Sequence, residues 1–184
     1  IKKEKKKKIF YRKISNSIKN ELPFKLTNSQ EKVLREIEND ISGNKRMFRI
    51  IQGDVGSGKT IVSFLAIANI IESGFQCALM SPTAILAKQH YDLAKKVFKK
   101  TDFKIDFLTG KTENKVKNEI LKNLINGKTN LLIGTHALFQ KKILFKKLGL
   151  AVIDEQHKFG VKQRLDLAKK GDDNCDVLLM SATP

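Results

Sequence analysis

Apolar residues recur along the chain in two different rhythms, which predict alternating strands and helices. Short runs that are almost continuously apolar are typical of strands buried on both faces of a sheet. Between these runs, apolar residues recur every three to four positions, as on a helix with one buried face. The predicted strands are 47–52, 77–81, 104–110, 131–135, 150–154 and 176–181. Helices are predicted from Thr27 or Asn28 to Gly43, from the residues after Lys59 through Ile71, from Ala84 to Lys100, and near 112–126.

This alternation predicts an α/β fold in which a parallel sheet is covered by helices on both faces, because strand–helix–strand units place neighbouring strands in parallel. In such sheets the loops at the carboxyl ends of the strands carry the functional site. The segment 22–184 contains no internal repeat and no low-complexity linker, so it is predicted to form one domain.

Residues 1–21 have a different character from the rest of the chain. The first thirteen contain eight basic residues and one acidic residue, and such a block is often a solvated arm. Its apolar residues nevertheless recur at roughly helical spacing, which also suits an amphipathic basic helix; they are Ile9, Phe10, Ile14 and Ile18. Pro23 is expected to end this segment. The sequence leaves both interpretations open.

The charge of the chain permits a nucleic-acid partner without establishing one. There are 36 basic residues against 19 acidic ones, for a net charge of +17, and this bias suits a polyanion. However, 31 of the basic residues are lysine, a bias that an A+T-rich genome would also produce. No apolar run is long enough to span a membrane, and no secretory signal is visible, so we expect a cytoplasmic protein without a membrane partner.

The cysteines and histidines do not predict a metal centre or a disulfide. Cys77 and Cys175 both lie in apolar runs and are expected to be buried, reduced thiols. His90, His136 and His157 stand far apart and match no zinc-binding spacing.

One segment matches the P-loop pattern G-x-x-x-x-G-K-[ST], between a predicted strand and a predicted helix. It reads Gly53-Asp54-Val55-Gly56-Ser57-Gly58-Lys59-Thr60. The glycines allow backbone N–H groups to approach phosphate oxygens, and the helix directs its positive end at them. Lys59 would reach the β- and γ-phosphates and Thr60 would bind Mg²⁺. The motif predicts a nucleotide site.

A second motif closes the strand 150–154 with two acidic residues, Asp154 and Glu155. Asp154 would hold Mg²⁺, mostly through water, and Glu155 would orient and activate the attacking water. Paired acids at a strand end are common, but after a P-loop in the same parallel sheet they predict hydrolysis of ATP.

The continuation of this motif, Asp154-Glu155-Gln156-His157, resembles motif II of superfamily 2 helicases. Further segments resemble the other motifs of these helicases; they are 22–30, 82–90, 108–110, 134–138 and 181–183. The resemblance implies a RecA-like motor lobe in which His157 is catalytic and Gln30 reads adenine. It implies DNA contacts by Thr83, Lys88, Gly110, Thr135 and His136, and a coupling role for Ser181, Ala182 and Thr183.

Within that superfamily, the segments 53–60, 135–140 and 154–160 together resemble the RecG family of branched-DNA helicases. Transcription-repair coupling translocases are the nearest alternative, but they more usually have glutamate in place of Gln156. This chain departs from the RecG pattern at Lys158, where arginine is usual, and at Ser181, where threonine is usual. Lysine keeps the charge but lacks the planar guanidinium of arginine, so the resemblance does not carry a bidentate contact over to this position.

The resemblance implies partners as well as a reaction. ATP and Mg²⁺ would be the cofactors and branched or forked DNA the substrate, with contacts to its backbone. Residues 1–21 would match the basic linker helix between a wedge domain and the motor, and 22–184 the first motor lobe. The wedge domain and a second motor lobe, which supplies an arginine finger, would be partners within the full-length protein, acting as a monomer.

Other P-loop enzymes fit less well. The N-K-x-D motif of GTPases and the LSGGQ motif of ABC-type ATPases are absent from these 184 residues. A small-molecule kinase would need several arginines in a lid, yet only Arg164 follows the P-loop. A DNA-binding fragment without catalysis of its own stays open as an alternative.

Overall fold

The computed structural model describes residues 5–154, 166–167, 169–171 and 174–182. Its strands are β1 (Phe48–Gln52), β2 (Gln76–Met80), β3 (Ile105–Leu108), β4 (Leu131–Gly134), β5 (Leu148–Asp154) and β6 (Asp176–Ser181). Its helices are α1 (Lys13–Glu21), α2 (Asn28–Ser42), α3 (Lys59–Glu72), α4 (Ala84–Val97), α5 (Asn114–Ile125) and the 3₁₀ turn η1 (His136–Phe139). Every strand and helix predicted for 22–184 is confirmed, with ends shifted by a few residues.

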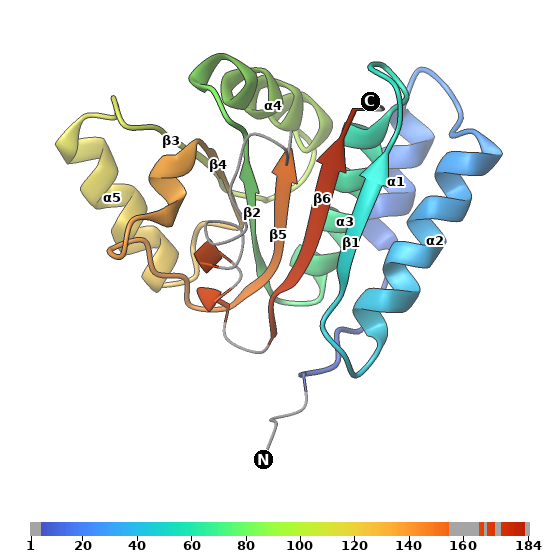
Figure 1. The fold of residues 1–184 in the computed structure, drawn as a ribbon, viewed down its shortest axis with the longest axis horizontal. Coiled ribbons are helices and arrows are strands. Elements are labelled where there is room, and N and C mark those ends of the chain that lie inside the picture. Colours follow the sequence, from blue (N-terminus) through green and yellow to red (C-terminus); the bar gives the residue numbers. More distant parts are fainter. Residues whose placement is uncertain (1–4, 155–165, 168, 172–173, 183–184) are drawn as a thin grey trace.

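The six strands form one sheet in the order β1-β6-β5-β2-β4-β3, and every pairing is parallel. All carboxyl ends therefore lie at the same edge, which is the upper edge in Figure 1. The predicted α/β fold is confirmed. The order matters for function, because β6 separates the strand that precedes the P-loop from the strand that ends at Asp154.

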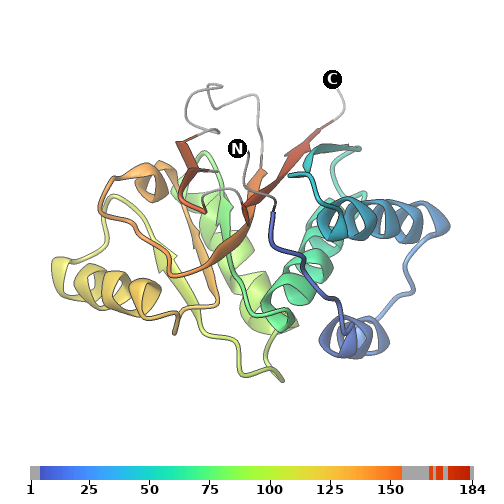
Figure 2. The ribbon, with the colours of Figure 1, turned by 90° about the horizontal axis from the view of Figure 1, so that it is seen from below.

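Helices cover both faces of the sheet (Figures 1 and 2). A separate hydrophobic core lies on each side. One core contains buried residues of α2, α3 and α4 packed on the sheet. The other contains residues of α5 and η1. Helix α3 is the central element of the first core, since ten consecutive residues from Val62 to Ile71 are buried. This explains why its sequence is apolar nearly all round.

The segment before residue 22 is packed against the lobe and is not a free arm in its described part. Helix α1 begins at Lys13, so Ile9 and Phe10 precede it, and the predicted four-residue apolar helix face is wrong at those two positions. Glu72 of α3 accepts hydrogen bonds from the first two backbone N–H groups of α1, at 3.0 and 3.1 Å. These N–H groups have no partner within their own helix, and Glu72 supplies one from a neighbouring element.

Two lysines of the same segment enter a buried ion cluster. Lys5 and Lys8 each lie 2.8 Å from an oxygen of Asp176, with side chains at most 1% exposed. Asp176 also accepts the backbone N–H of Met47 at 2.7 Å. Neither lysine can contact DNA phosphate while it is buried here. The charge of Lys5 and Lys8 therefore serves the fold.

Both cysteines are buried and reduced, as the sequence predicted. Burial raises the pKa of the Cys175 thiol to about 12, and burial also raises the pKa of Cys77 well above its usual range. Both groups are therefore protonated at neutral pH and are poor nucleophiles. Among the described residues, no helix is long and apolar enough to cross a membrane.

Candidate nucleotide and DNA site

The P-loop follows β1 directly and leads into α3 at the carboxyl edge of the sheet. Gly56 and Gly58 have φ angles of +83° and +84°, a left-handed conformation that side chains disfavour. Val55 is 91% exposed at the tip. The backbone of the loop is thus curved and open to solvent, as a phosphate-binding loop must be.

The ammonium group of Lys59 turns back into this loop. Its Nζ donates to the carbonyl oxygens of Gly53 at 2.6 Å and Asp54 at 2.9 Å. These are bonds to neutral acceptors, which phosphate oxygens can replace with stronger, charge-assisted ones. Thr60 stands beside Lys59 in the first turn of α3, so the lysine and the hydroxyl predicted for phosphate and Mg²⁺ lie on the same helix end.

Gln30 connects the start of α2 to the P-loop. Its side-chain amide donates to the carbonyl of Ser57 at 2.8 Å, and its oxygen accepts the backbone N–H of Thr27 at 2.9 Å. Thr27 is the N-cap of α2, and its side chain accepts the backbone N–H of Gln30, which completes a capping box. A methyl group on Gly58 would overlap the Gln30 amide. The proposed adenine reader therefore touches the phosphate loop.

Asp154 is the last residue of β5 and its side chain is 13% exposed. Its Oδ2 lies 2.6 Å from Nε2 of His90 on α4. β5 is two strands from β1, so Asp154 stands about 10 Å across the sheet from the start of the P-loop. Ser181 on the intervening β6 accepts the N–H of Gly53 at 3.3 Å. This contact places the proposed coupling motif directly against the P-loop.

The residues predicted to touch DNA follow β2, β3 and β4 at the same edge. Thr83 is the N-cap of α4 and accepts the N–H of Leu86 at 3.2 Å. Lys88, Gly110 and His136 are exposed. Thr135 differs, since it is 4% exposed and its backbone is bonded to Leu108 and Leu138. Little of this residue is therefore accessible to solvent in this structure.

Three of the predicted site residues, and one departure from the RecG pattern, cannot be placed. Glu155, His157 and Thr183, and the departure from the RecG pattern at Lys158, lie outside the described residues. Ala182 is described and follows Ser181, whose hydroxyl donates to its carbonyl at 3.1 Å.

The comparisons with known proteins agree with this geometry. Residues 27–184 match the family model for DEAD/DEAH box helicases. The chain is 52% identical over 163 residues to the ATP-dependent DNA helicases RecG of Bacillus subtilis and Thermotoga maritima. Each match covers 89% of this chain. It covers 24% of the Bacillus subtilis protein and 21% of the Thermotoga maritima protein. It superposes on a structure of RecG bound to a three-way DNA junction with a TM-score of 0.88 and 45% identity, covering 98% of this chain and 24% of that one.

The chain belongs to the DEAD/DEAH box helicase family. The family model matches most of its length, and the resemblance to RecG-type helicases and the RecA-like fold are both confirmed. The chain spans about a quarter or less of the curated relatives it matches.

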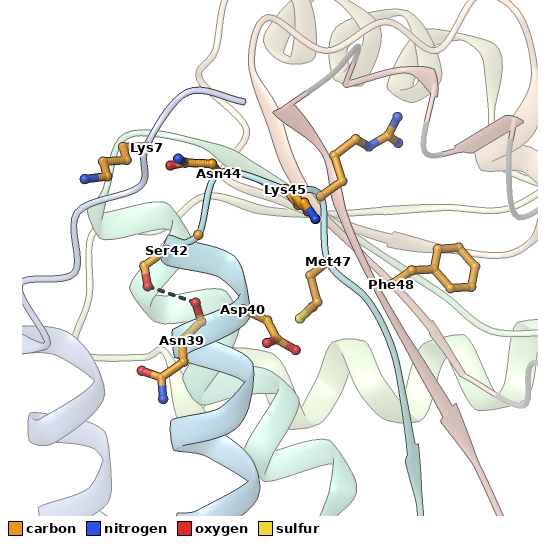
Figure 3. A pocket seen from close by; sticks show the side chains of 10 residues that line it. Lys7, Asn39, Asp40, Ser42, Asn44, Lys45, Met47 and Phe48 are labelled. Atoms are coloured by element: carbon orange, nitrogen blue, oxygen red, sulfur yellow. Dashed lines mark hydrogen bonds between the residues drawn. The ribbon is translucent and has the colours of Figure 1, made fainter. Parts of the chain in front are cut away.

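The helicase lobe also has a hollow of about 710 Å³ that is not part of this site. It lies where α2 ends and β1 begins, at the opposite end of β1 from the P-loop, and Figure 3 shows its lining. Asp40, on its wall, is bonded to Arg49. Its position argues against a nucleotide site there, since a helicase lobe binds at the carboxyl ends of its strands.

Two features of the helicase site were missed by the sequence interpretation. One is the contact between His90 and Asp154, and the other is the contact between Gln30 and the P-loop carbonyl. Both join residues far apart in the chain, and the first depends on β2 and β5 being neighbours in the sheet. No local pattern in the sequence carries that information.

Proposed function

We propose that this chain is the ATP-binding motor lobe of a branched-DNA helicase that couples ATP hydrolysis to the remodelling of replication forks and recombination junctions. The observation that carries the proposal is the loop 53–60, in which Lys59 and Thr60 stand at the start of a buried helix beside Gln30. The similarity to RecG, and to a RecG structure on a three-way DNA junction, supports branched DNA as the substrate.

The described residues fit an ATP–Mg²⁺ complex by their chemistry. Lys59 offers an ammonium group, α3 offers its positive end, and Thr60 and Asp154 offer the hydroxyl and carboxylate oxygens that Mg²⁺ prefers. When bound, Mg²⁺ neutralises charge on the β- and γ-phosphates. Lys59 would hold the phosphates, Gln30 the adenine, and Glu155 would take the proton of the attacking water.

Replacing Lys59 with alanine tests the nucleotide site. The lysine contributes a charge-assisted contact worth about 1.5–3 kcal/mol, so we expect ADP affinity to fall roughly tenfold to hundredfold. Calorimetry with Mg²⁺–ADP measures it. Lys95→Ala removes an equal charge from the exposed last turn of α4 and should leave the affinity unchanged. Equal affinity in wild type and Lys59→Ala would refute the proposal.

The loops after β2 to β4 are proposed to contact the DNA backbone rather than base edges, because a motor must move along any sequence. Lys88 is the charged member of this set, on the second turn of α4. Its ammonium is bound only to Asp92 among the described acidic groups, at 2.8 Å, with both side chains 55% exposed. It is therefore accessible to a phosphate.

Lys88→Ala is expected to weaken DNA binding equally on all sequences. The slope of log affinity against log salt concentration should also become less steep, by about 0.7 for single strands or about 0.9 for duplex. Fluorescence anisotropy at several salt concentrations measures both. Lys95→Ala, two helical turns further from the carboxyl edge, is the matched control and should change neither. A loss that depends on DNA sequence would indicate base reading and would contradict the proposal.

A further inference from the structure

A histidine that the helicase motifs leave without a chemical role touches the proposed metal ligand. His90 Nε2 lies 2.6 Å from Oδ2 of Asp154, and the two side chains are 11% and 13% exposed. The residues are 64 positions apart in the chain. They meet because β2, which leads into α4, pairs with β5 in a register that sets Met80 beside Ile153.

Two largely buried polar groups of this kind restrain each other's orientation. A hydrogen bond to a carboxylate is stronger than one between neutral groups, and little water competes for it at this depth. A carboxylate has about four acceptor positions. The bond from His90 to Oδ2 therefore restrains the orientation of the Asp154 carboxylate.

The element that carries His90 is itself firmly fixed. Thr83 caps the first turn of α4, and Ala87 and Ala94, on either side of His90 in the sequence, are both fully buried. His90 follows Thr83 by two turns, or about 10 Å along the axis. The imidazole thus reaches Asp154 from a rigid, packed helix rather than from a loop.

We propose that His90 is a positioning residue that orients the Asp154 carboxylate for the Mg²⁺ of bound ATP. The proposal rests on the proposed function, because it needs the Mg²⁺–ATP site. Partners that orient the ligands of a metal typically change metal affinity or activity by about tenfold to hundredfold when they are removed. His90 itself touches neither nucleotide nor metal in this scheme.

Binding of a non-hydrolysable ATP analogue, the β,γ-imido compound, tests the proposal in the 184-residue chain. Calorimetry is run with excess Mg²⁺ and again with EDTA, and the ratio of the two affinities is the Mg²⁺ gain. His90→Phe keeps a ring but removes the donor, and we expect its Mg²⁺ gain to fall about tenfold. Its affinity in EDTA should stay at the wild-type value.

Two conservative variants separate positioning from packing. In His90→Gln the side-chain amide stands near the position of Nε2 and should restore most of the Mg²⁺ gain. In His90→Asn the amide is one methylene shorter, so the gain should stay low. This pair carries the test if His90→Phe does not fold. Gln89→Ala, an exposed neighbour on the same helix, should behave as wild type.

The outcomes are distinguishable. A wild-type chain without any Mg²⁺ gain would overturn the proposed function together with this inference. An unchanged or larger gain in His90→Phe, beside a normal wild-type gain, would overturn the positioning role alone. Equal losses in Mg²⁺ and EDTA for all three His90 variants would show a packing role and would also overturn it.

Discussion

Replacing Asp176 with asparagine is expected to lower the free energy of unfolding by about 3–5 kcal/mol, because it leaves two buried ammonium groups without a counter-charge. Lys5 and Lys8 each contact one oxygen of this carboxylate at 2.8 Å, and the Asp176 side chain is fully buried. Their remaining hydrogen bonds go to the backbone carbonyls of Lys45 and Asn174, which carry no charge. The corresponding fall in melting temperature is about 6–20 °C.

The pH dependence of the variant should identify the cause. Burial lowers the pKa of Lys8 below its usual value, and the attraction of Asp176 opposes that change. Removing the carboxylate should lower this pKa further. The unfolded chain then binds more protons than the folded chain at all pH values between the two pKa values of Lys8. Stability should therefore rise with pH in that window, and more steeply in Asp176→Asn than in wild type.

A rescue variant tests whether the loss of stability comes from unpaired buried charge or from lost packing. The triple variant Lys5→Met, Lys8→Met and Asp176→Asn has no buried charge in this cluster, and its asparagine oxygen can still accept the N–H of Met47. We expect it to recover most of the lost stability in urea unfolding. Asp92→Asn breaks an exposed pair with Lys88 and should cost at most about 1 kcal/mol. A triple variant no more stable than Asp176→Asn would contradict the explanation.

The strands and helices could be predicted because each is a local pattern. An apolar run such as 176–181 has few alternatives to a buried strand, and Thr27 with Gln30 is a capping box that is visible in the sequence. The P-loop is equally local, since the chemistry of phosphate binding fixes four residue types within eight consecutive positions. For these features the sequence and the structure agree.

What the sequence could not supply is which segments meet. Nothing around Lys5 or Lys8 shows that they form ion pairs with Asp176, and the sequence left open whether their segment is a solvated arm or a basic helix. Nor does the motif around His90 show that it reaches Asp154. Both contacts depend on the order of strands in the sheet, which follows from packing over the whole domain. The role of Thr135 is affected in the same way, because its burial comes from neighbouring strands.

A polypeptide of these 184 residues is expected to hydrolyse ATP about 10³- to 10⁵-fold more slowly than the same lobe joined to a second motor lobe. That factor is typical of the arginine finger in comparable systems. Three of the described arginines form ion pairs or hydrogen bonds with partners outside the P-loop. Arg12 binds Glu38, Arg49 binds Glu36 and Asp40, and Arg46 donates to the carbonyl of Cys175. Lys59 is thus the cation that the described structure places in the loop.

A coupled assay with saturating DNA measures this difference, with nucleotide binding measured in parallel. The 184-residue chain should bind ADP normally, so that slow turnover reflects a missing catalytic group and not a missing site. In the two-lobe protein, Glu155→Gln should retain ATP binding but lose turnover, because an amide cannot take the proton of the attacking water. Rapid, DNA-stimulated turnover by the 184 residues alone would mean that the transition-state charge is stabilised from within this lobe, and the requirement for a second lobe would then be wrong.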